Sequence, residues 1–252
     1  MSNPFDLSGR VALVTGANTG LGQGIAIALA RAGADIVAVG RSVPTETEGE
    51  VARAGRRLLW VEASLDTIAP VRCIVERAVA EFGAVDILVN NAGIIRRNDS
   101  LDFTEEDWDA VMDVNLKSVF FLSQAAARWW SAQGRGGKII NIASMLSFQG
   151  GIRVPSYTAS KSGVLGITRL LANEWAGKGI NVNAIAPGYF ATNNTEALRN
   201  DEARNRSILE RIPAGHWGKP EDIGGAAVFL ASPAADYVHG AVLPVDGGWL
   251  AR

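Results

Sequence analysis

The sequence predicts an α/β protein, a single domain built on a doubly wound parallel sheet of about seven strands with helices on both faces. Three observations lead to this prediction. Short apolar runs alternate with longer amphipathic stretches along all 252 residues. No linker and no shift in composition divides the chain. Glycine is enriched, with 28 residues or about 11%, against roughly 7% in average proteins.

Seven short runs rich in valine and isoleucine are the predicted strands. They are apolar on successive positions, a pattern typical of strands buried on both faces of a parallel sheet. The runs are Arg10–Thr15, Asp35–Val39, Leu58–Val61, Ile87–Asn90, Lys138–Ile142, Ile180–Ile185 and Val242–Val245.

The stretches between these runs carry apolar residues at three- and four-residue spacing, which predicts amphipathic helices. Strand and helix in alternation predict right-handed crossovers between parallel strands. The helices are Gly20–Arg31, Pro44–Ala54, Pro70–Phe82, Glu105–Lys117 continuing to Trp130, Tyr157–Ala176 and Glu221–Ala231.

One segment, at about 190–212, departs from this alternation. Its polar and charge-rich part, Asn193–Ile212, follows a Pro-Gly pair. We expect it to form a mobile helical flap over a substrate site. In such sheets ligands bind beyond the carboxyl ends of the strands, which is where this segment begins.

Charge and composition exclude several classes of protein. The formal net charge is -2 and basic residues do not cluster beyond pairs such as Arg56-Arg57, so we expect no nucleic-acid partner. Cys73 is the single cysteine, which excludes an intrachain disulfide. A signal-like N-terminus and apolar stretches of spanning length are both lacking, so we expect a cytoplasmic protein without a membrane partner. His216 and His239 lack neighbouring ligand residues, so no metal site is expected.

A glycine-rich turn follows the first predicted strand and precedes the first predicted helix. It places Gly16, Gly20 and Gly22 after Thr15. Glycines at such a turn let the backbone approach a pyrophosphate and direct the helix N-terminus at negative charge. Glycine turns also serve merely to connect elements, so the pattern alone leaves both interpretations open.

Two further turns lie at the carboxyl ends of predicted strands. The run from Asn90 to Gly93 follows the fourth strand and carries small or amide side chains that can pack beside an adenine and ribose without obstructing them. Pro187 and Gly188 follow the sixth strand. The run from Asn90 to Gly93 is also compatible with an ordinary turn. Asp86, ahead of the fourth strand, is expected to support the fold.

Tyr157 and Lys161 are four residues apart at the start of a predicted helix, so their side chains share one face. A free phenol has a pKa near 10, but a cation about 4 Å away contributes roughly 4 kcal/mol at an effective dielectric constant of about 20, or about three pKa units. Lys161 is therefore expected to bring the pKa of Tyr157 near 7, where acid–base catalysis is efficient. Ser144 lies at the carboxyl end of the fifth predicted strand, just beyond Ile142, and can hold a substrate oxygen. A serine hydrolase is excluded, because the G-x-S-x-G elbow is lacking.

Together these motifs resemble the short-chain dehydrogenase/reductase family over nearly the whole chain. The resemblance implies one NAD(P)-binding Rossmann domain over residues 1–252 and a catalytic tetrad of Asn115, Ser144, Tyr157 and Lys161, with Asn115 holding a water that links Lys161 to solvent. The cofactor contacts that it implies are Gly16, Asn18, Thr19, Gly20, Leu21, Gly22, Arg41, Ser64, Leu65, Asn91, Ala92, Gly93, Tyr157, Lys161, Pro187, Gly188, Phe190 and Thr192. A dinucleotide-sensing protein of the same fold would not need the tetrad.

The end of the second strand bears on the choice of cofactor. An acidic residue there holds the ribose diol of NAD, whereas an arginine accommodates the 2′-phosphate of NADP. Gly40 stands where the acid is expected and Arg41 follows it, which favours NADP. Ser64 stands where the family usually has an aspartate. The resemblance nevertheless implies NAD, so NAD is the expected cofactor and Arg41 leaves NADP open.

Longer runs, including that around Ser144 and Tyr157 and the ending VDGGWLAR, resemble the subgroup of this family that oxidises or reduces 2-dehydro-3-deoxy-D-gluconate and 2-deoxy-D-gluconate in pectin and uronate breakdown. A sugar acid carries a carboxylate, which Arg96 or Arg153 can bind in bidentate fashion. The full set of expected substrate contacts is Arg96, Ser144, Met145, Gln149, Arg153, Tyr157, Tyr189 and Asn193. Dehydrogenases of gluconate and reductases of carrier-bound 3-oxoacyl groups share the tetrad and remain alternatives.

The family resemblance also implies a homotetramer, formed by pairing two long helices. One of these ends in Trp129 and Trp130 and the other contains Trp175, more aromatic surface than one sheet face needs.

Overall fold

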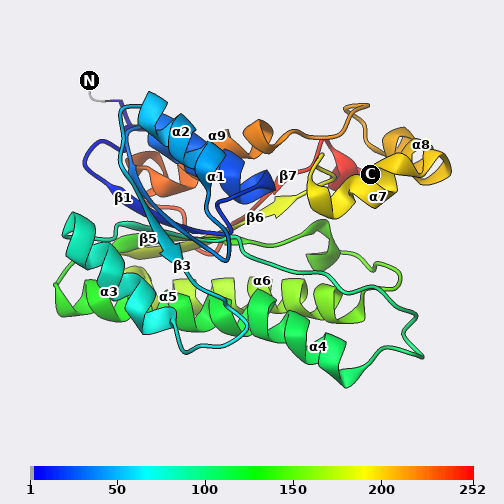
Figure 1. Cartoon of the computed structure of the whole chain (residues 1–252), viewed down its shortest axis with the longest axis horizontal. Coiled ribbons are helices and arrows are strands. Elements are labelled where there is room, and N and C mark those ends of the chain that lie inside the picture. The colour runs from blue at the N-terminus through cyan, green and yellow to red at the C-terminus, as the bar shows by residue number, and fades with distance from the viewer. Residues whose placement is uncertain (1–2) are drawn as a thin grey trace.

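The computed structural model describes residues 3–252, which form one seven-stranded parallel sheet in the order β3-β2-β1-β4-β5-β6-β7 (Figure 1). This architecture confirms the predicted fold class, and each strand lies within two residues of its predicted bounds. The strands are β1 (Val11–Thr15), β2 (Asp35–Gly40), β3 (Leu58–Glu62), β4 (Ile87–Asn90), β5 (Gly137–Ile142), β6 (Ile180–Pro187) and β7 (Val242–Val245).

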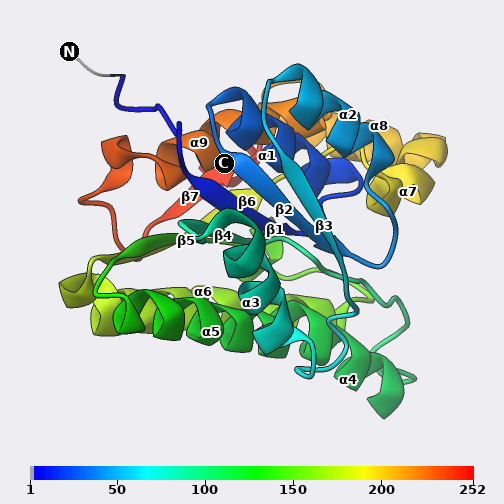
Figure 2. The same cartoon turned by 60° about the vertical axis from the view of Figure 1, so that its left-hand side comes forward.

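Helices cover both faces of the sheet. Figures 1 and 2 show α1, α2 and α9 on one face and α3, α5 and α6 on the other. Within residues 3–252, no helix combines the length and apolar character needed to cross a membrane. The helices are α1 (Gly20–Arg31), α2 (Thr45–Arg53), α3 (Val71–Phe82), α4 (Glu105–Met112), α5 (Ser118–Ala132), α6 (Pro155–Trp175), α7 (Glu196–Asn200), α8 (Glu202–Arg211) and α9 (Gly224–Ala231).

Strand β1 explains why the predicted strands are apolar on successive positions. Ala12 and Val14 pack into the core cluster that contains residues of α1 and α9. Val11 and Leu13 pack into the cluster beneath α3 and α5. Because successive side chains of a strand point to opposite faces, a strand covered by helices on both sides requires apolar residues throughout.

The junction between β1 and β4 is joined by the side chain of Thr15. Its buried hydroxyl accepts hydrogen bonds from the backbone N–H groups of Asn91 (3.0 Å) and Ala92 (2.9 Å). The Asn91 side-chain amide returns a bond of 2.9 Å to the Thr15 carbonyl oxygen. These bonds fix the chain after β4 against the chain after β1, where the crossovers run in opposite directions along the sheet.

The long helix expected from Glu105 to Trp130 is interrupted. A π-helical turn, Asp113–Lys117, separates α4 from α5 and contains the buried side chain of Asn115. That side chain accepts a bond from the Ile94 N–H (2.8 Å) and donates one to the Ile94 carbonyl (2.9 Å). Apolar periodicity does not reveal such an insertion, because the flanking α-helical turns keep their own spacing.

Trp130 belongs to the core of its own chain. It is 0% exposed, and its indole N–H donates to the Val85 carbonyl oxygen at 2.6 Å. A Cβ on Gly137 would come within 2.2 Å of the ring, so glycine is required beneath it. The expectation that Trp130 supplies aromatic surface for another subunit is therefore wrong, because the ring fills the space between α5 and β5.

Residues after β6 leave the sheet and form α7 and α8, the region for which sequence predicted a helical flap. Figure 1 shows these two short helices at the same end of the molecule as the C-terminus. Thr195 binds the Phe190 and Thr192 carbonyls at 2.6 and 3.0 Å, and so folds the start of this segment back on itself.

We predict that replacing Thr15 with valine lowers the free energy of unfolding by about 2–4 kcal/mol. Valine keeps the shape but leaves two partly buried N–H groups without an acceptor, each at a cost in the lower part of the range of about 1–3 kcal/mol. Urea unfolding followed by tryptophan fluorescence measures the change. Thr15→Ser keeps the hydroxyl and is expected to lose less than half as much. Equal losses in the two variants would contradict this role of the hydroxyl.

Candidate active site

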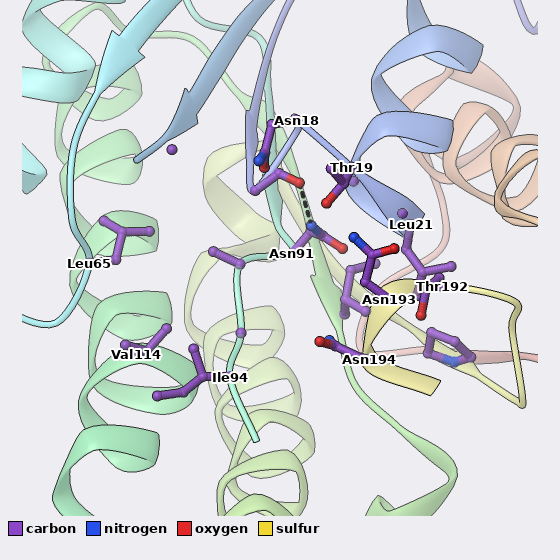
Figure 3. A pocket seen from close by; sticks show the side chains of 18 of the residues that line it. Asn18, Thr19, Leu21, Leu65, Asn91, Ile94, Val114, Thr192, Asn193 and Asn194 are labelled. Carbon is purple, nitrogen blue, oxygen red and sulfur yellow. Dashed lines mark hydrogen bonds between the residues drawn. The ribbon is translucent and has the colours of Figure 1, made fainter. Parts of the chain in front are cut away.

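A cavity of about 630 Å³ lies beyond the carboxyl ends of the strands. Figure 3 shows Leu65 and Val114 on one side of it and Thr192 and Asn193 on the other, with Asn91 between them. The sequence-predicted residues that line it are Gly16, Asn18, Thr19, Gly20, Leu21, Gly22, Arg41, Ser64, Leu65, Asn91, Ala92, Gly93, Arg96, Ser144, Tyr157, Lys161, Pro187, Gly188, Phe190, Thr192 and Asn193. Segments that are far apart in the sequence thus form one wall, as expected for parallel strands that end at one edge.

The glycine turn leaves no room for side chains at the start of α1. Gly16 has a φ of +66°, a conformation that favours glycine. A Cβ on Gly22 would lie 2.1 Å from the Gly16 carbonyl oxygen and 2.3 Å from the Asn91 amide nitrogen. This close packing brings the N-terminus of α1, with its positive dipole end, to the cavity wall. The turn therefore fits a dinucleotide pyrophosphate.

The end of β2 offers a cation where a ribose-binding acid would stand. Gly40 and Arg41 both line the cavity, and Arg41 is exposed. Beside them, the Asn18 amide donates to the Ser42 hydroxyl at 2.7 Å. A guanidinium, an amide and a hydroxyl at this edge suit a phosphate group, and a carboxylate in place of Gly40 would repel it.

Tyr157, Lys161 and Ser144 meet at the other part of the cavity. Tyr157 and Lys161 lie on the first two turns of α6. Ser144 is the second residue after the end of β5. The Lys161 ammonium donates to the Ile142 carbonyl oxygen at 2.6 Å and lies 5.7 Å from the centroid of the Tyr157 ring. The Ser144 hydroxyl accepts a bond from the Leu146 N–H at 3.1 Å. The hydroxyl groups of Ser144 and Tyr157 can thus approach one substrate oxygen.

Burial sets the proton affinities of this group. It raises the pKa of Tyr157 above its ordinary value of 10.0, against the opposing effects of a hydrogen bond with Ser144 and the charge of Arg97. Burial also lowers the pKa of Lys161 to about 8. The expectation that Lys161 brings the pKa of Tyr157 near 7 is therefore wrong for this structure, because the desolvation of the phenol outweighs the hydrogen bond with Ser144 and the charge of Arg97.

Asn115 lies behind the cavity wall and holds it in place. Besides its two bonds to Ile94, its amide donates to the Ser160 hydroxyl at 3.4 Å. Its side chain thus connects the loop after Gly93 to α6, the helix that carries Tyr157 and Lys161. Its expected role in holding a water beside Lys161 stays a prediction.

The expected carboxylate-binding arginines lie in different surroundings. Arg96 lines the cavity and pairs with Asp107, with 3.1 Å between Nε and Oδ1. Arg153 pairs at 3.5 Å with Asp99 and lies outside the residues that line the cavity within the described part of the chain. Its φ of +62° keeps it in a tight turn. The structure therefore brings Arg96 to the site but leaves Arg153 at its edge.

Three further expected substrate contacts, Met145, Gln149 and Tyr189, belong to a cluster beside the cavity. Met145 is buried in a small apolar cluster, and Tyr189 packs against that cluster. The side-chain amide oxygen of Gln149 (Oε1) accepts bonds from Arg211 (3.1 Å) and Trp249 (3.2 Å). Gln149 thus holds neighbouring segments together, which the sequence did not reveal because its two partners are distant along the chain.

Arg97 is a site residue that sequence analysis missed. Its charge acts on the hydroxyl of Tyr157, and its guanidinium donates to the Asn194 carbonyl oxygen at 3.4 Å. It therefore spans from the loop after β4 to the segment that precedes α7. The Arg96-Arg97 pair was visible in the sequence, but only the course of the loop decides which of the two charges acts on Tyr157.

Comparison with known proteins places these features in a family. A family profile described as Enoyl-(Acyl carrier protein) reductase matches residues 16–250. The chain is 66% identical to the 2-dehydro-3-deoxy-D-gluconate 5-dehydrogenase of Escherichia coli K12 over 98% of both sequences, and 65% identical to that of Dickeya dadantii over 99% of both. A crystal structure of a putative 2-deoxy-D-gluconate 3-dehydrogenase from Agrobacterium tumefaciens, with bound NADP, is 63% identical and superimposes with a TM-score of 0.95 over 100% of both chains.

These likenesses extend over the glycine turn, the β4 loop and the Ser144, Tyr157 and Lys161 group alike. The seven-stranded parallel sheet and the placement of these residues at its carboxyl edge agree with them. The chain belongs to the short-chain dehydrogenase/reductase family.

Proposed function

We propose that the chain is an NAD(P)-dependent dehydrogenase that interconverts a keto and a hydroxy sugar acid, acting as a 2-dehydro-3-deoxy-D-gluconate 5-dehydrogenase, also called 2-deoxy-D-gluconate 3-dehydrogenase. The observation that carries the proposal is that a dinucleotide-binding turn and a proton-transfer group line the same cavity. The glycine turn at α1 fits a pyrophosphate, and Ser144, Tyr157 and Lys161 lie on the same wall. The names of the two enzymes that are 66% and 65% identical support the choice of substrate.

The protein residues supply the proton chemistry. When bound, the nicotinamide supplies or accepts the hydride. Because its pKa is raised, the Tyr157 phenol is protonated at neutral pH and can donate its proton to a keto oxygen. Ser144 holds that oxygen by a second hydrogen bond, which orients the carbonyl. Lys161, with a pKa of about 8, is mostly cationic at neutral pH and stabilises the phenolate that remains.

The carboxylate of the substrate requires a cation near the reacting carbon. Arg96 lines the cavity, and the charge of Arg97 acts on Tyr157 itself. We propose that one or both bind the carboxylate, with Asn193 on the facing wall. A bidentate contact would present one carbon of the sugar chain to the nicotinamide and so set the position of oxidation.

Assembly and location belong to the same proposal. A homotetramer is supported by α5 and α6, two long helices that lie side by side on one face of the sheet (Figure 1). Leu170 on α6 is 49% exposed, and Phe120 on α5 is partly exposed, so apolar surface is available there.

A cytoplasmic location and a role in pectin breakdown belong to the same proposal. We propose the flap at 190–212 as a mobile cover of the sugar acid.

The function is tested by following cofactor oxidation with three substrates: a 5-keto-3-deoxy sugar acid, 5-ketogluconate and an acetoacetyl thioester. The 5-keto-3-deoxy acid is expected to give the highest kcat/KM, and a preference for the thioester would indicate a 3-oxoacyl reductase instead. Tyr157→Phe removes the proton donor and is expected to lower kcat by at least about 100-fold. Its dissociation constant for NADH should change less than threefold.

Tyr237→Phe is the matched control, because this tyrosine is 99% exposed and lies outside the site. It is expected to leave kcat unchanged. Full activity of Tyr157→Phe would exclude the proposed mechanism and would favour a sensing role for the bound dinucleotide.

We propose that the chain accepts NADP as well as NAD, because Arg41 and Ser42 lie where a 2′-phosphate would stand. A charge-assisted hydrogen bond contributes about 1.5–3 kcal/mol, so Arg41→Ala is expected to lower kcat/KM for NADPH by about 10- to 100-fold. The value for NADH should change less than threefold. Steady-state kinetics with both cofactors measures the ratio, and an equal loss with both would show that Arg41 does not read the phosphate.

Arg96→Leu and Arg97→Leu are expected to raise KM for the sugar acid by about tenfold or more, since each removes a cation that can pair with the carboxylate. KM for a neutral ketone should stay within threefold. Arg153→Leu is the control, because Arg153 pairs with Asp99, lies outside the cavity lining and, unlike Arg97, is not among the charges that act on Tyr157. The carboxylate assignment fails if neither of the first two variants separates the acid from the ketone.

A further inference from the structure

The C-terminal residues form a turn that the proposed chemistry does not use. Asp246 accepts hydrogen bonds from the N–H groups of Gly248 and Leu250, each at 2.9 Å. Gly247 and Gly248 have φ angles of +63° and +88°, a region that favours glycine. This turn directs Trp249 inward, where it is only 4% exposed.

Trp249 contacts three segments that come from different parts of the chain. Its ring lies 4.8 Å from that of Tyr189, which follows β6. The Arg211 guanidinium, at the end of α8, lies 4.1 Å above the indole. The indole N–H of Trp249 donates at 3.2 Å to the side-chain Oε1 of Gln149, in the loop that follows Ser144.

The same residue completes an apolar cluster beneath α8. Met145, Ile208 and Ile212 are each at most 5% exposed and pack with Trp249. Ile208 and Ile212 belong to the flap, whereas Met145 is the neighbour of Ser144. Two apolar side chains of the flap therefore have their buried partners on the C-terminal turn and on the loop that carries the substrate-binding hydroxyl.

The backbone keeps this packing tight. The Ala214 N–H donates to the Gly247 carbonyl oxygen at 3.0 Å, which joins the end of the flap to the turn. A Cβ on Gly248 would come within 3.0 Å of the Pro213 ring, and one on Gly247 within 2.9 Å of Ile212. The glycine pair thus allows the turn to approach the flap closely enough for Trp249 to reach across it.

We propose that Trp249 is a positioning residue that determines sugar-acid affinity by holding the flap helix α8 against the loop after Ser144. The proposal rests on the proposed function for the identity of the substrate. The residues that Trp249 holds flank the cavity lining: Met145 is next to Ser144, and Tyr189 lies between Gly188 and Phe190. Trp249 itself is outside the cavity lining, and it packs against the flap at Ile208 and Ile212, well along the chain from the expected cofactor contacts Phe190 and Thr192. We therefore expect it to act on the substrate side and to leave dinucleotide binding unchanged.

The test compares two matched substitutions, Trp249→Phe and Trp130→Phe. Each removes one indole N–H from a buried tryptophan, with the loss of a bond to Gln149 or to Val85. Trp249→Phe is expected to raise KM for the sugar acid by about fivefold or more, with kcat changed less than twofold and the dissociation constant for NADH unchanged. Trp130→Phe is expected to lower the temperature of unfolding while KM stays the same.

Arg211→Gln provides a second variant, since this surface side chain can be replaced without risk to the core. Arg211→Gln should also raise KM for the sugar acid. Hydrogen exchange of residues 193–212, measured without substrate, should speed up at least threefold in Trp249→Phe and Arg211→Gln but not in Trp130→Phe.

The proposal is overturned if both variants keep the KM and the exchange of the wild type, or if Trp130→Phe changes them equally. A wild type that reduces no sugar acid would refute the proposed function alone, because the exchange measurement still shows whether Trp249 holds the flap.

Discussion

The hydroxyl of Thr15 sits at the point on which the site depends. Here β1 is flanked by β2 on one side and β4 on the other, and the chain leaves both β1 and β4 toward the same cavity. By accepting the N–H groups of Asn91 and Ala92, Thr15 holds the glycine turn and the β4 loop at a constant separation. Gly22 tolerates no side chain for the same reason, since Asn91 and Gly16 already occupy that space. The dinucleotide site in this fold therefore depends first on how closely these backbone segments pack.

Burial links this packing to the chemistry. The low-dielectric wall that excludes water around α6 raises the pKa of Tyr157 and lowers that of Lys161. The same buried environment thus keeps the Tyr157 phenol protonated and makes the Lys161 ammonium lose its proton more easily. Asn115 maintains the arrangement from behind, because its amide joins the β4 loop to α6. The π-helical turn that carries Asn115 is therefore part of the site, and its Val114 lines the cavity.

Sequence patterns predicted much of this organisation. The strand runs were recognisable because a sheet covered on both faces requires apolar residues at every position, and the glycine turn and the Tyr157–Lys161 spacing were recognisable because each is local. The π turn escaped prediction because the contacts of its Asn115 are with Ile94, 21 residues away along the chain. The burial of Trp130 depends on Gly137 at the start of β5 and on the Val85 carbonyl oxygen, 45 residues away along the chain. Amphipathic spacing does not separate such a core face from a subunit face.

The sequence by itself determined the fold class, the edge of the sheet at which ligands bind, and the residue types that carry out proton transfer. Only the tertiary structure decided which of the arginines reaches the cavity, how Gln149 is used, and in which direction the pKa of Tyr157 shifts. The physical reason is the range of the interactions. Periodicity and turn chemistry act over a few residues, whereas desolvation and the contacts of Arg97, Gln149 and Trp249 arise between segments that only the folded sheet brings together.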